Sequence, residues 1–219
     1  QVVLLLHKDS AGNLFLVGVI RDITQRKLME EHLQRTAAEL FRSNNELKLN
    51  EDHLRYLAYH DPLTGLSNRK FFGEELYQSL HWAQENNLLL GLLFIDLDGF
   101  KQVNDTLGHE KGDRLLMTIA GRLSNSLRAS DTVSRLGGDE FTVILRAIPN
   151  NQIAAKVAEK ILSSISEPIV LDGYATRVSA SIGISVYPYN GKDSETLIKQ
   201  ADAAMYRAKY LGKNRYEFA

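Results

Sequence analysis

One stretch of this sequence, residues 25–57, contains neither glycine nor proline and is rich in Glu, Leu, Arg, Lys and Gln. These residue types favour a helix and none of them interrupts one, so the stretch predicts a single continuous helix. From Met29 to Leu57 that helix is about 43 Å long at ~1.5 Å per residue, more than the core of a small domain requires. It therefore predicts a stalk that divides the chain into residues 1–24, 25–58 and 59–219.

Leucines recur every seven residues along this predicted helix, as in one core layer of a coiled coil: Leu33, Leu40, Leu47 and Leu54. The facing layer is small or polar, which predicts a weak or adjustable seam: Ala37, Asn44, Glu51 and Ala58. Two interpretations are open, because the helix either pairs with that of a second copy or is a solvated linker that never pairs. We expect a coiled-coil stalk in a homodimer, since the helix lies between two folded parts.

The first part of the chain, residues 1–24, predicts a β-hairpin. Gln1–His7 and Leu14–Ile20 are rich in β-forming residues and flank a cluster of turn-forming residues at 8–13. Two strands alone are marginally stable in water. We therefore interpret them as the last strands of a sheet domain that begins upstream.

Composition limits the class of protein. Apolar residues make up 44% of the chain, which is enough for a core, and the formal charge of −1 argues against nucleic-acid binding. There is no cysteine, which excludes disulfides and thiolate metal sites. The longest apolar runs, Val2–Leu6 and Leu88–Ile95, fall far short of the ~20 residues of a membrane span. We expect a cytoplasmic location and no membrane contact by this chain, while an upstream membrane anchor stays open.

The third part, residues 59–219, predicts an α+β domain. Helices alternate with strands that read as a mostly antiparallel sheet, an arrangement typical of a ferredoxin-like palm. The expected elements are a helix capped by Ser67, a buried strand at 88–95, a helix after Gly112-Asp113, a hairpin over 132–145, a helix at 153–165, a strand at 178–186, a helix from Ser194 and an edge strand at 215–218.

Acidic residues stand at two places where this sheet is expected to end. Asp96 follows a buried apolar run, and Asp139 and Glu140 follow two glycines in a tight turn. Clustered oxygen ligands without cysteine suit Mg²⁺, and two such metals activate an attacking hydroxyl and neutralise a leaving pyrophosphate. The alternative is that these acids are simply solvated at strand ends and in an ordinary hairpin turn.

Residues 135–141, with the sequence RLGGDEF, resemble the motif that names the GGDEF family of diguanylate cyclases. Four further segments resemble that family's motifs in the same order: residues 61–69, 94–101, 104–113 and 201–214. Upstream, Val17–Lys27 looks like the closing strand of a PAS sensor leading into a signalling helix.

The resemblance implies an activity and its partners. Members condense two GTP into cyclic di-GMP with release of two pyrophosphates, and each monomer of a dimer holds one GTP half-site. The implied cofactor is Mg²⁺ or Mn²⁺, with two ions per active site. From the adjustable seam of the stalk we expect an upstream sensor to regulate the reaction by changing how often the two half-sites meet.

The resemblance also assigns roles to individual residues. It implies that Asp96, Asp139 and the carbonyl of Leu97 hold the metals, and that Asp139, or less readily Glu140, is the base for the 3′-hydroxyl. Asn104 and Asp113 match the pair that reads guanine, with His109 beside them. The implied phosphate contacts are the N–H groups of Gly99, Phe100 and Lys101 and the side chains of Lys209 and Lys213.

Two features qualify this resemblance. The family more often has Arg at the position of Lys213, so a forked phosphate contact becomes a point contact. Arg128 and Asp131 resemble an Arg-x-x-Asp site at which cyclic di-GMP inhibits, and the alternative for this pair is a helix-end Arg beside a turn Asp.

A different function is also open, namely a weak GTP- or cyclic di-GMP-binding module, including one that precedes an EAL phosphodiesterase domain.

Overall fold

The computed structural model describes the backbone of all 219 residues and every side chain except those of Val19 and Tyr174. Its contacts divide the chain into two units, Gln1–Leu54 and Arg55–Ala219. Among the described residues, no helix combines the length and the apolar character that crossing a membrane demands.

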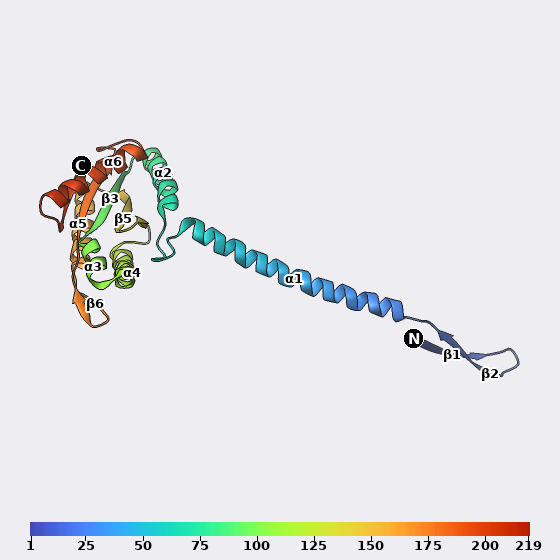
Figure 1. The fold of residues 1–219 in the computed structure, drawn as a ribbon. Coiled ribbons are helices and arrows are strands. Elements are labelled where there is room, and N and C mark those ends of the chain that lie inside the picture. The colour runs from blue at the N-terminus through green and yellow to red at the C-terminus, as the bar shows by residue number, and fades with distance from the viewer. The chain divides into compact units, whose positions relative to one another are not determined.

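The first unit contains the predicted hairpin and most of the predicted helix (Figure 1). Strands β1 (Val2–Lys8) and β2 (Leu14–Ile20) pair antiparallel, and helix α1 runs over Thr24–Tyr59. The carboxylate of Asp9 holds the hairpin turn by accepting the backbone N–H groups of Ala11 and Asn13 at 2.9 and 2.8 Å. Both elements are therefore confirmed as local structure.

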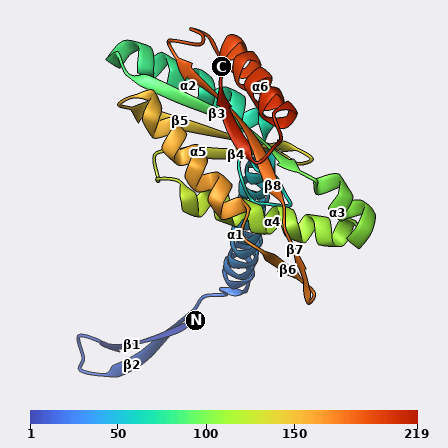
Figure 2. The same ribbon diagram turned by 90° about the vertical axis from the view of Figure 1, so that its left-hand side faces the viewer.

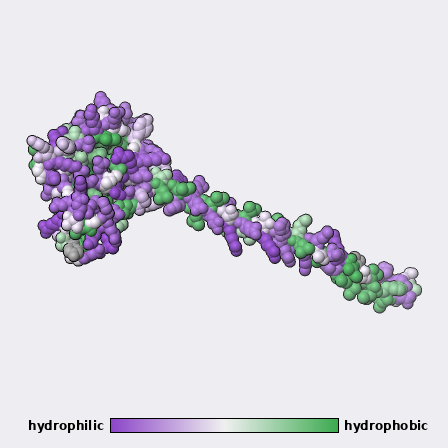
Figure 3. Space-filling model, in the orientation of Figure 1, coloured by the Kyte–Doolittle hydropathy of each residue, from purple (hydrophilic) through white to green (hydrophobic). Residues whose placement is uncertain are grey.

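Helix α1 buries none of its described residues within this chain. Hydrophobic residues lie at intervals along it between polar ones (Figure 3). The four leucines of the seven-residue repeat are among them, each about two-thirds exposed. Such a helix is stable in water if a partner covers its apolar residues, or if ion pairs between its own polar side chains stabilise it enough. The structure of one chain does not distinguish these cases, so the coiled-coil interpretation stays a prediction.

The second unit is an α+β domain whose elements alternate along the chain. They are α2 (Arg69–Asn86), β3 (Leu89–Asp98), α3 (Phe100–Leu107), α4 (His109–Ser126), β4 (Thr132–Gly137), β5 (Glu140–Ile148), α5 (Asn151–Ile165), β6 (Ile169–Leu171), β7 (Tyr174–Thr176), β8 (Ser179–Tyr187), α6 (Ser194–Tyr210) and β9 (Arg215–Phe218). The predicted fold class is confirmed.

Five strands form one sheet in the order β4-β5-β3-β8-β9 (Figure 2). All neighbours pair antiparallel except β8 and β9, which are parallel. β3 lies at the centre because its apolar run is buried on both faces. Its last residues therefore emerge between the ends of β5 and β8, where the candidate site forms.

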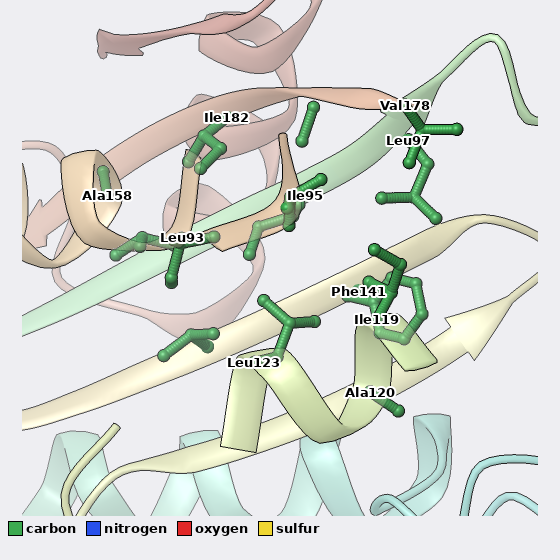
Figure 4. Packing of buried hydrophobic residues seen from close by; sticks show 14 of the residues in the cluster. Leu93, Ile95, Leu97, Ile119, Ala120, Leu123, Phe141, Ala158, Val178 and Ile182 are labelled. Atoms are coloured by element: carbon green, nitrogen blue, oxygen red, sulfur yellow. The ribbon is translucent and has the colours of Figure 1, made fainter. Parts of the chain in front are cut away.

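Helices cover both faces of the sheet. α4 and α5 pack on one face, where Leu93, Ile95 and Phe141 of the sheet meet Ile119 and Leu123 of α4 (Figure 4). On the other face, α2 and α6 contribute a second buried cluster. Gly183 of β8 permits the close approach of α6, because a Cβ there would lie 1.9 Å from the carbonyl oxygen of Ala201.

Three local predictions were wrong or incomplete. Asn68, not Ser67, caps α2, accepting the N–H of Phe71 at 3.1 Å, while Ser67 bridges to Ser134 of β4. Gly112 lies inside α4, which begins earlier than predicted because Gly108 ends α3 and the chain re-enters a helix at once. The short hairpin β6–β7 was not predicted, since three-residue strands leave too little periodicity to detect.

Candidate active site

The central strand brings Asp96 to the turn that carries Asp139. In the sheet register, Asp96 lies opposite Glu140 of β5 on one side and Ser181 of β8 on the other. The N–H of Leu97 donates to the carbonyl oxygen of Asp139 at 3.3 Å. Two acids far apart in the sequence are thus held at one edge of the sheet.

The turn between β4 and β5 depends on its two glycines. Gly137 has φ +148° and Gly138 has φ +53°, and both values lie in the region that favours glycine. A Cβ on either residue would meet no atom within 4 Å, so backbone conformation rather than crowding selects glycine here. The result is a tight turn that presents Asp139 half-buried beside the end of β3.

Arg135 fixes this turn from within β4. Its Nε and Nη2 donate to the carbonyl oxygen of Gly138 at 3.0 and 2.8 Å, and its Nη1 donates to both carboxylate oxygens of Asp61 at 2.9 and 3.0 Å. Burial opposes ionisation of Asp61, but hydrogen bonds from Thr64 and Arg135 outweigh it and hold its pKa below the usual value. The segment before α2 is thereby fastened to the turn.

Glu140 has a different partner from Asp139. Its carboxylate lies 3.6 Å from Nη2 of Arg69, at the start of α2, where the Arg69 side chain is largely exposed and that of Glu140 is partly exposed. Arg69 also donates through Nε to the carbonyl oxygen of Leu136 at 3.3 Å. Of the two acids of the turn, Asp139 is therefore the one whose charge acts on Asp96.

Asp96 is buried and paired with a lysine from the last turn of α6. Nζ of Lys209 lies 2.8 Å from its Oδ2. Burial is the largest influence on the pKa of Asp96 and raises it, and the charges of Asp139 and Asp98 raise it further. Lys209 offsets these effects only in part, so this carboxylate is held in an unfavourably negative environment.

Asp96 and Asp139 alone are too few ligands to enclose a metal ion. Among the side chains that the structure describes, no three of His, Cys, Asp or Glu gather closely enough to hold an ion. Asp96 and Asp139 supply hard oxygen donors whose mutual repulsion a cation would relieve. This donor set fits Mg²⁺, which usually takes one or two carboxylates and completes its shell with water and substrate phosphates.

Asp98 connects the edge of the sheet that carries Asp96 and Asp139 to the loop that carries Lys213. Its carboxylate accepts the hydroxyls of Ser179 and Ser181 at 2.7 and 2.8 Å and the N–H of Asn214 at 3.2 Å. Lys213 and Asn214 both have positive φ, +63° and +48°. Asp98 thus anchors a strained loop beside the C-terminus of α6.

The predicted guanine-reading residues lie on two consecutive helices. Asn104 belongs to α3, and His109 and Asp113 belong to the first turns of α4. The side-chain oxygen of Asn104 is buried and has no hydrogen-bond partner among the described atoms. Gly112 makes room for it, since a Cβ there would lie 1.8 Å from that oxygen.

The predicted phosphate cradle lies at the start of α3. Gly99 precedes the helix with φ +81° and no side chain caps the N-terminus that Gly99, Phe100 and Lys101 form, so their role in binding phosphate stays a prediction. Arg128 and Asp131 lie away from these residues, after α4, where they help to line a pocket of about 260 Å³ with Lys156 and Lys160. In it, the Asp131 carboxylate accepts the N–H of Arg128 at 3.1 Å.

Sequence reasoning missed the residues that position the site. Arg135, Asp61 and Asp98 were quoted only as parts of motifs, although each holds a segment that carries a predicted site residue. Their signal was present, since each is a charged residue next to a buried strand or a glycine turn. The partners of these three residues lie up to 116 positions away in the sequence, so motif spacing alone does not reveal the contacts.

The fold and this arrangement of acids define a class of protein. The chain belongs to the family described as diguanylate cyclase, GGDEF domain, which it matches over residues 58–215. It is 44% identical over 182 residues to the bifunctional diguanylate cyclase/cyclic di-GMP phosphodiesterase MucR of Pseudomonas aeruginosa, covering 83% of this chain and 25% of that protein.

Solved structures extend the likeness to the fold. The GGDEF domain of TpbB (YfiN) from Pseudomonas aeruginosa superposes with a TM-score of 0.72 at 43% identity, covering 74% of this chain and 94% of that one. The coiled coil and GGDEF domain of DgcB from Caulobacter crescentus, in complex with c-di-GMP, has a TM-score of 0.74 at 28% identity over 87% and 99%. The chain spans about a quarter to a third of the curated relatives MucR and TpbB.

Proposed function

We propose that this chain is a diguanylate cyclase that condenses two GTP into cyclic di-GMP and releases two pyrophosphates. The observation that carries the proposal is the convergence of Asp96 and Asp139 at one edge of the sheet. Membership of the GGDEF family supports the same reaction. GTP as substrate, two metal ions per site and a homodimer are parts of this proposal.

Asp96, Asp139 and the carbonyl of Leu97 would hold Mg²⁺ or Mn²⁺. When bound, the metals lower the charge on the phosphates and favour ionisation of the attacking hydroxyl. Asp139 is proposed as the base for the 3′-hydroxyl because its charge acts on Asp96, whereas Glu140 pairs with Arg69. The 3′-oxygen then forms a bond to the α-phosphorus of the other GTP, and the bond to pyrophosphate breaks.

Asn104 and Asp113 are proposed to read the guanine. A carboxylate accepts from the guanine N1–H and amino group, and an amide supplies the complementary donor. The buried, unpartnered oxygen of Asn104 supports a ligand at this position, since an unsatisfied acceptor is costly and an N–H of the guanine would satisfy it while the amide NH2 donates to the guanine acceptors. His109, exposed at the start of α4, would flank the base.

The phosphates would lie between the N-terminus of α3 and the C-terminus of α6. The free N–H groups of Gly99, Phe100 and Lys101 favour an anion there. Lys209 and Lys213 contribute positive charge from the opposite side, Lys213 through the loop that Asp98 anchors. A lysine at this second position predicts a weaker phosphate contact than the forked one of arginine.

The reaction requires two half-sites, because each nucleotide attacks the other. We propose that α1 pairs two copies through its exposed leucines and that an upstream PAS-type sensor changes the alignment of this stalk. Arg128 and Asp131 are proposed to bind cyclic di-GMP as an inhibitor, with the Arg128 guanidinium on the guanine O6 and N7. The pocket they share with Lys156 and Lys160 supports this second site.

A second candidate function is a GTP- or cyclic di-GMP-binding regulatory module attached to an EAL phosphodiesterase domain. The observation that favours it is the match to MucR, a bifunctional protein of which this chain spans only a quarter. Incubation of the purified chain with GTP and Mg²⁺, followed by nucleotide chromatography, separates the two functions. Cyclic di-GMP and pyrophosphate support the cyclase, whereas bound but unconverted GTP contradicts it and supports the module.

A further inference from the structure

The pairing of Lys209 with Asp96 joins two residues that the proposed function assigns to different ligands. Lys209 is proposed for the phosphates and Asp96 for the metal, yet in the structure their side chains meet at 2.8 Å. Their contact fills one oxygen of the carboxylate that the metal requires. Lys209 and a metal ion at Asp96 therefore compete for the same acceptor.

The electrostatics explain why Lys209 lies there. Asp96 is only 9% exposed, and the charges of Asp139 and Asp98 both act against its ionised form. A buried carboxylate without a counter-charge is strongly unfavourable. The Lys209 ammonium supplies that counter-charge in the protein without ligands.

The side chain of Lys209 is also able to leave. It is 31% exposed, lies in the last turn of α6, and carries a compact charge on a flexible stem. Arg135 provides the contrast, since four hydrogen bonds to Asp61 and Gly138 hold its guanidinium in one place. The site thus combines one fixed cation with one exchangeable cation.

We propose that Lys209 is a stand-in cation, which neutralises Asp96 in the nucleotide-free protein and transfers to the phosphates when metal and nucleotide bind. This inference rests on the proposed function and deepens it by naming how the site is regulated. Metal alone must displace Lys209 into solvent and binds weakly. Metal with nucleotide gives Lys209 a new anionic partner, so the two ligands favour each other's binding.

The test measures Mn²⁺ binding to the nucleotide-free chain by electron paramagnetic resonance, which counts the free ion. Lys209→Met keeps the stem and removes the charge, and we expect it to bind Mn²⁺ about fivefold or more tightly than wild type. The matched control is Lys199→Met, an exposed lysine earlier on the same helix, and its affinity should stay within about twofold of wild type. Equal or weaker binding by Lys209→Met overturns the proposal.

Two further variants keep the test decisive. Lys209→Gln repeats the charge removal in case the methionine variant fails to fold, with circular dichroism as the check. The double variant Lys209→Met/Asp96→Asn should lose the added affinity, and if it keeps that affinity the extra ion binds elsewhere and the proposal fails. The Mn²⁺ measurement contains no nucleotide and therefore tests this inference alone. Incubation of the wild-type chain with GTP and Mg²⁺ tests the proposed function separately, so failure of one is distinguishable from failure of the other.

Discussion

Arg135 holds both carboxylate oxygens of Asp61 at 2.9 and 3.0 Å while the same guanidinium holds the carbonyl oxygen of Gly138. One side chain thereby links the segment that follows α1 to the turn that presents Asp139. The two charged groups are mostly buried, with 11% and 16% of their side chains exposed. The position of the turn therefore depends on the segment 74 residues before it.

The variant Arg135→Lys should lose this double attachment, because an ammonium cannot bind a carboxylate and a carbonyl in forked geometry. We expect a loss of about 2–3 kcal/mol in the free energy of unfolding, measured by urea denaturation at neutral pH. The difference should shrink in acid, since the pKa of Asp61 is depressed in the fold and its contribution disappears as the pH falls through that value.

Arg215→Lys is the control for that variant, because Arg215 is 46% exposed and pairs with its neighbour Glu217. It should change stability by less than about 0.5 kcal/mol. An Arg135→Lys protein as stable as this control would show that the forked contacts contribute nothing to the fold.

Gly112→Ala tests the guanine assignment without removing a predicted contact residue. The new Cβ would lie 1.8 Å from the side-chain oxygen of Asn104, which must swing away. Stability should change by less than about 1 kcal/mol, since Ala is the better helix former. The affinity for GTP should fall about tenfold, which calorimetry with a non-reactive GTP analogue measures.

Gly121→Ala is the matched control on the same helix, where a Cβ meets no atom within 4 Å. It should leave the affinity for the nucleotide unchanged. If both variants bind the analogue like wild type, Asn104 does not contact the base.

Asp96→Asn should raise stability at neutral pH although it removes a site residue. The pKa of Asp96 is higher in the folded chain than its ordinary value. The free energy of unfolding of the wild type therefore decreases as the pH rises from the ordinary pKa of an aspartate through the pKa of Asp96 in the folded chain. Asparagine carries no charge, and the advantage of the variant should therefore shrink at acid pH. Urea denaturation at neutral and acid pH checks this, and a variant less stable than wild type at neutral pH would contradict it.

Exchanging both Leu40 and Leu47 for Gln tests the stalk. These side chains are 66% and 65% exposed in the single chain, so their loss should not unfold it. We expect the protein to sediment as a monomer and its cyclase rate in dilute solution to fall about tenfold or more, given the weak seam. Leu49→Gln, which lies outside the repeat, should change neither property. Full cyclase activity of the double variant in dilute solution would contradict the proposal that α1 pairs two copies of the chain.

The sequence predicted most elements because their signals are local. The apolar run of β3, the periodicity of α6 and the glycine pair before Asp139 each act within a few residues. The boundary at Gly108 was missed because one glycine ends α3 and starts α4 without a loop between them. Helix limits of this kind depend on packing, which a single sequence does not display.

The candidate site was predicted unevenly for the same reason. Asp96 and Asp139 were expected to share a site because one stands where an apolar run ends, the other stands in a glycine turn, and the family resemblance implies that both hold metal. The contacts of Asp98 with Asn214 and of Lys209 with Asp96 were not expected, because they join the first sheet strand of the domain to its last helix and loop. Such contacts arise from the strand order β3-β8-β9, which no local pattern encodes.

The most direct measurement of the central claim compares rates of cyclic di-GMP formation by wild type and Asp139→Asn, with GTP and Mg²⁺ in excess. Loss of one metal-binding carboxylate should cost about 4 kcal/mol of transition-state stabilisation, roughly a thousandfold in rate, with an unchanged circular dichroism spectrum. An Asp139→Asn protein that makes cyclic di-GMP at the wild-type rate would contradict the assignment of this carboxylate.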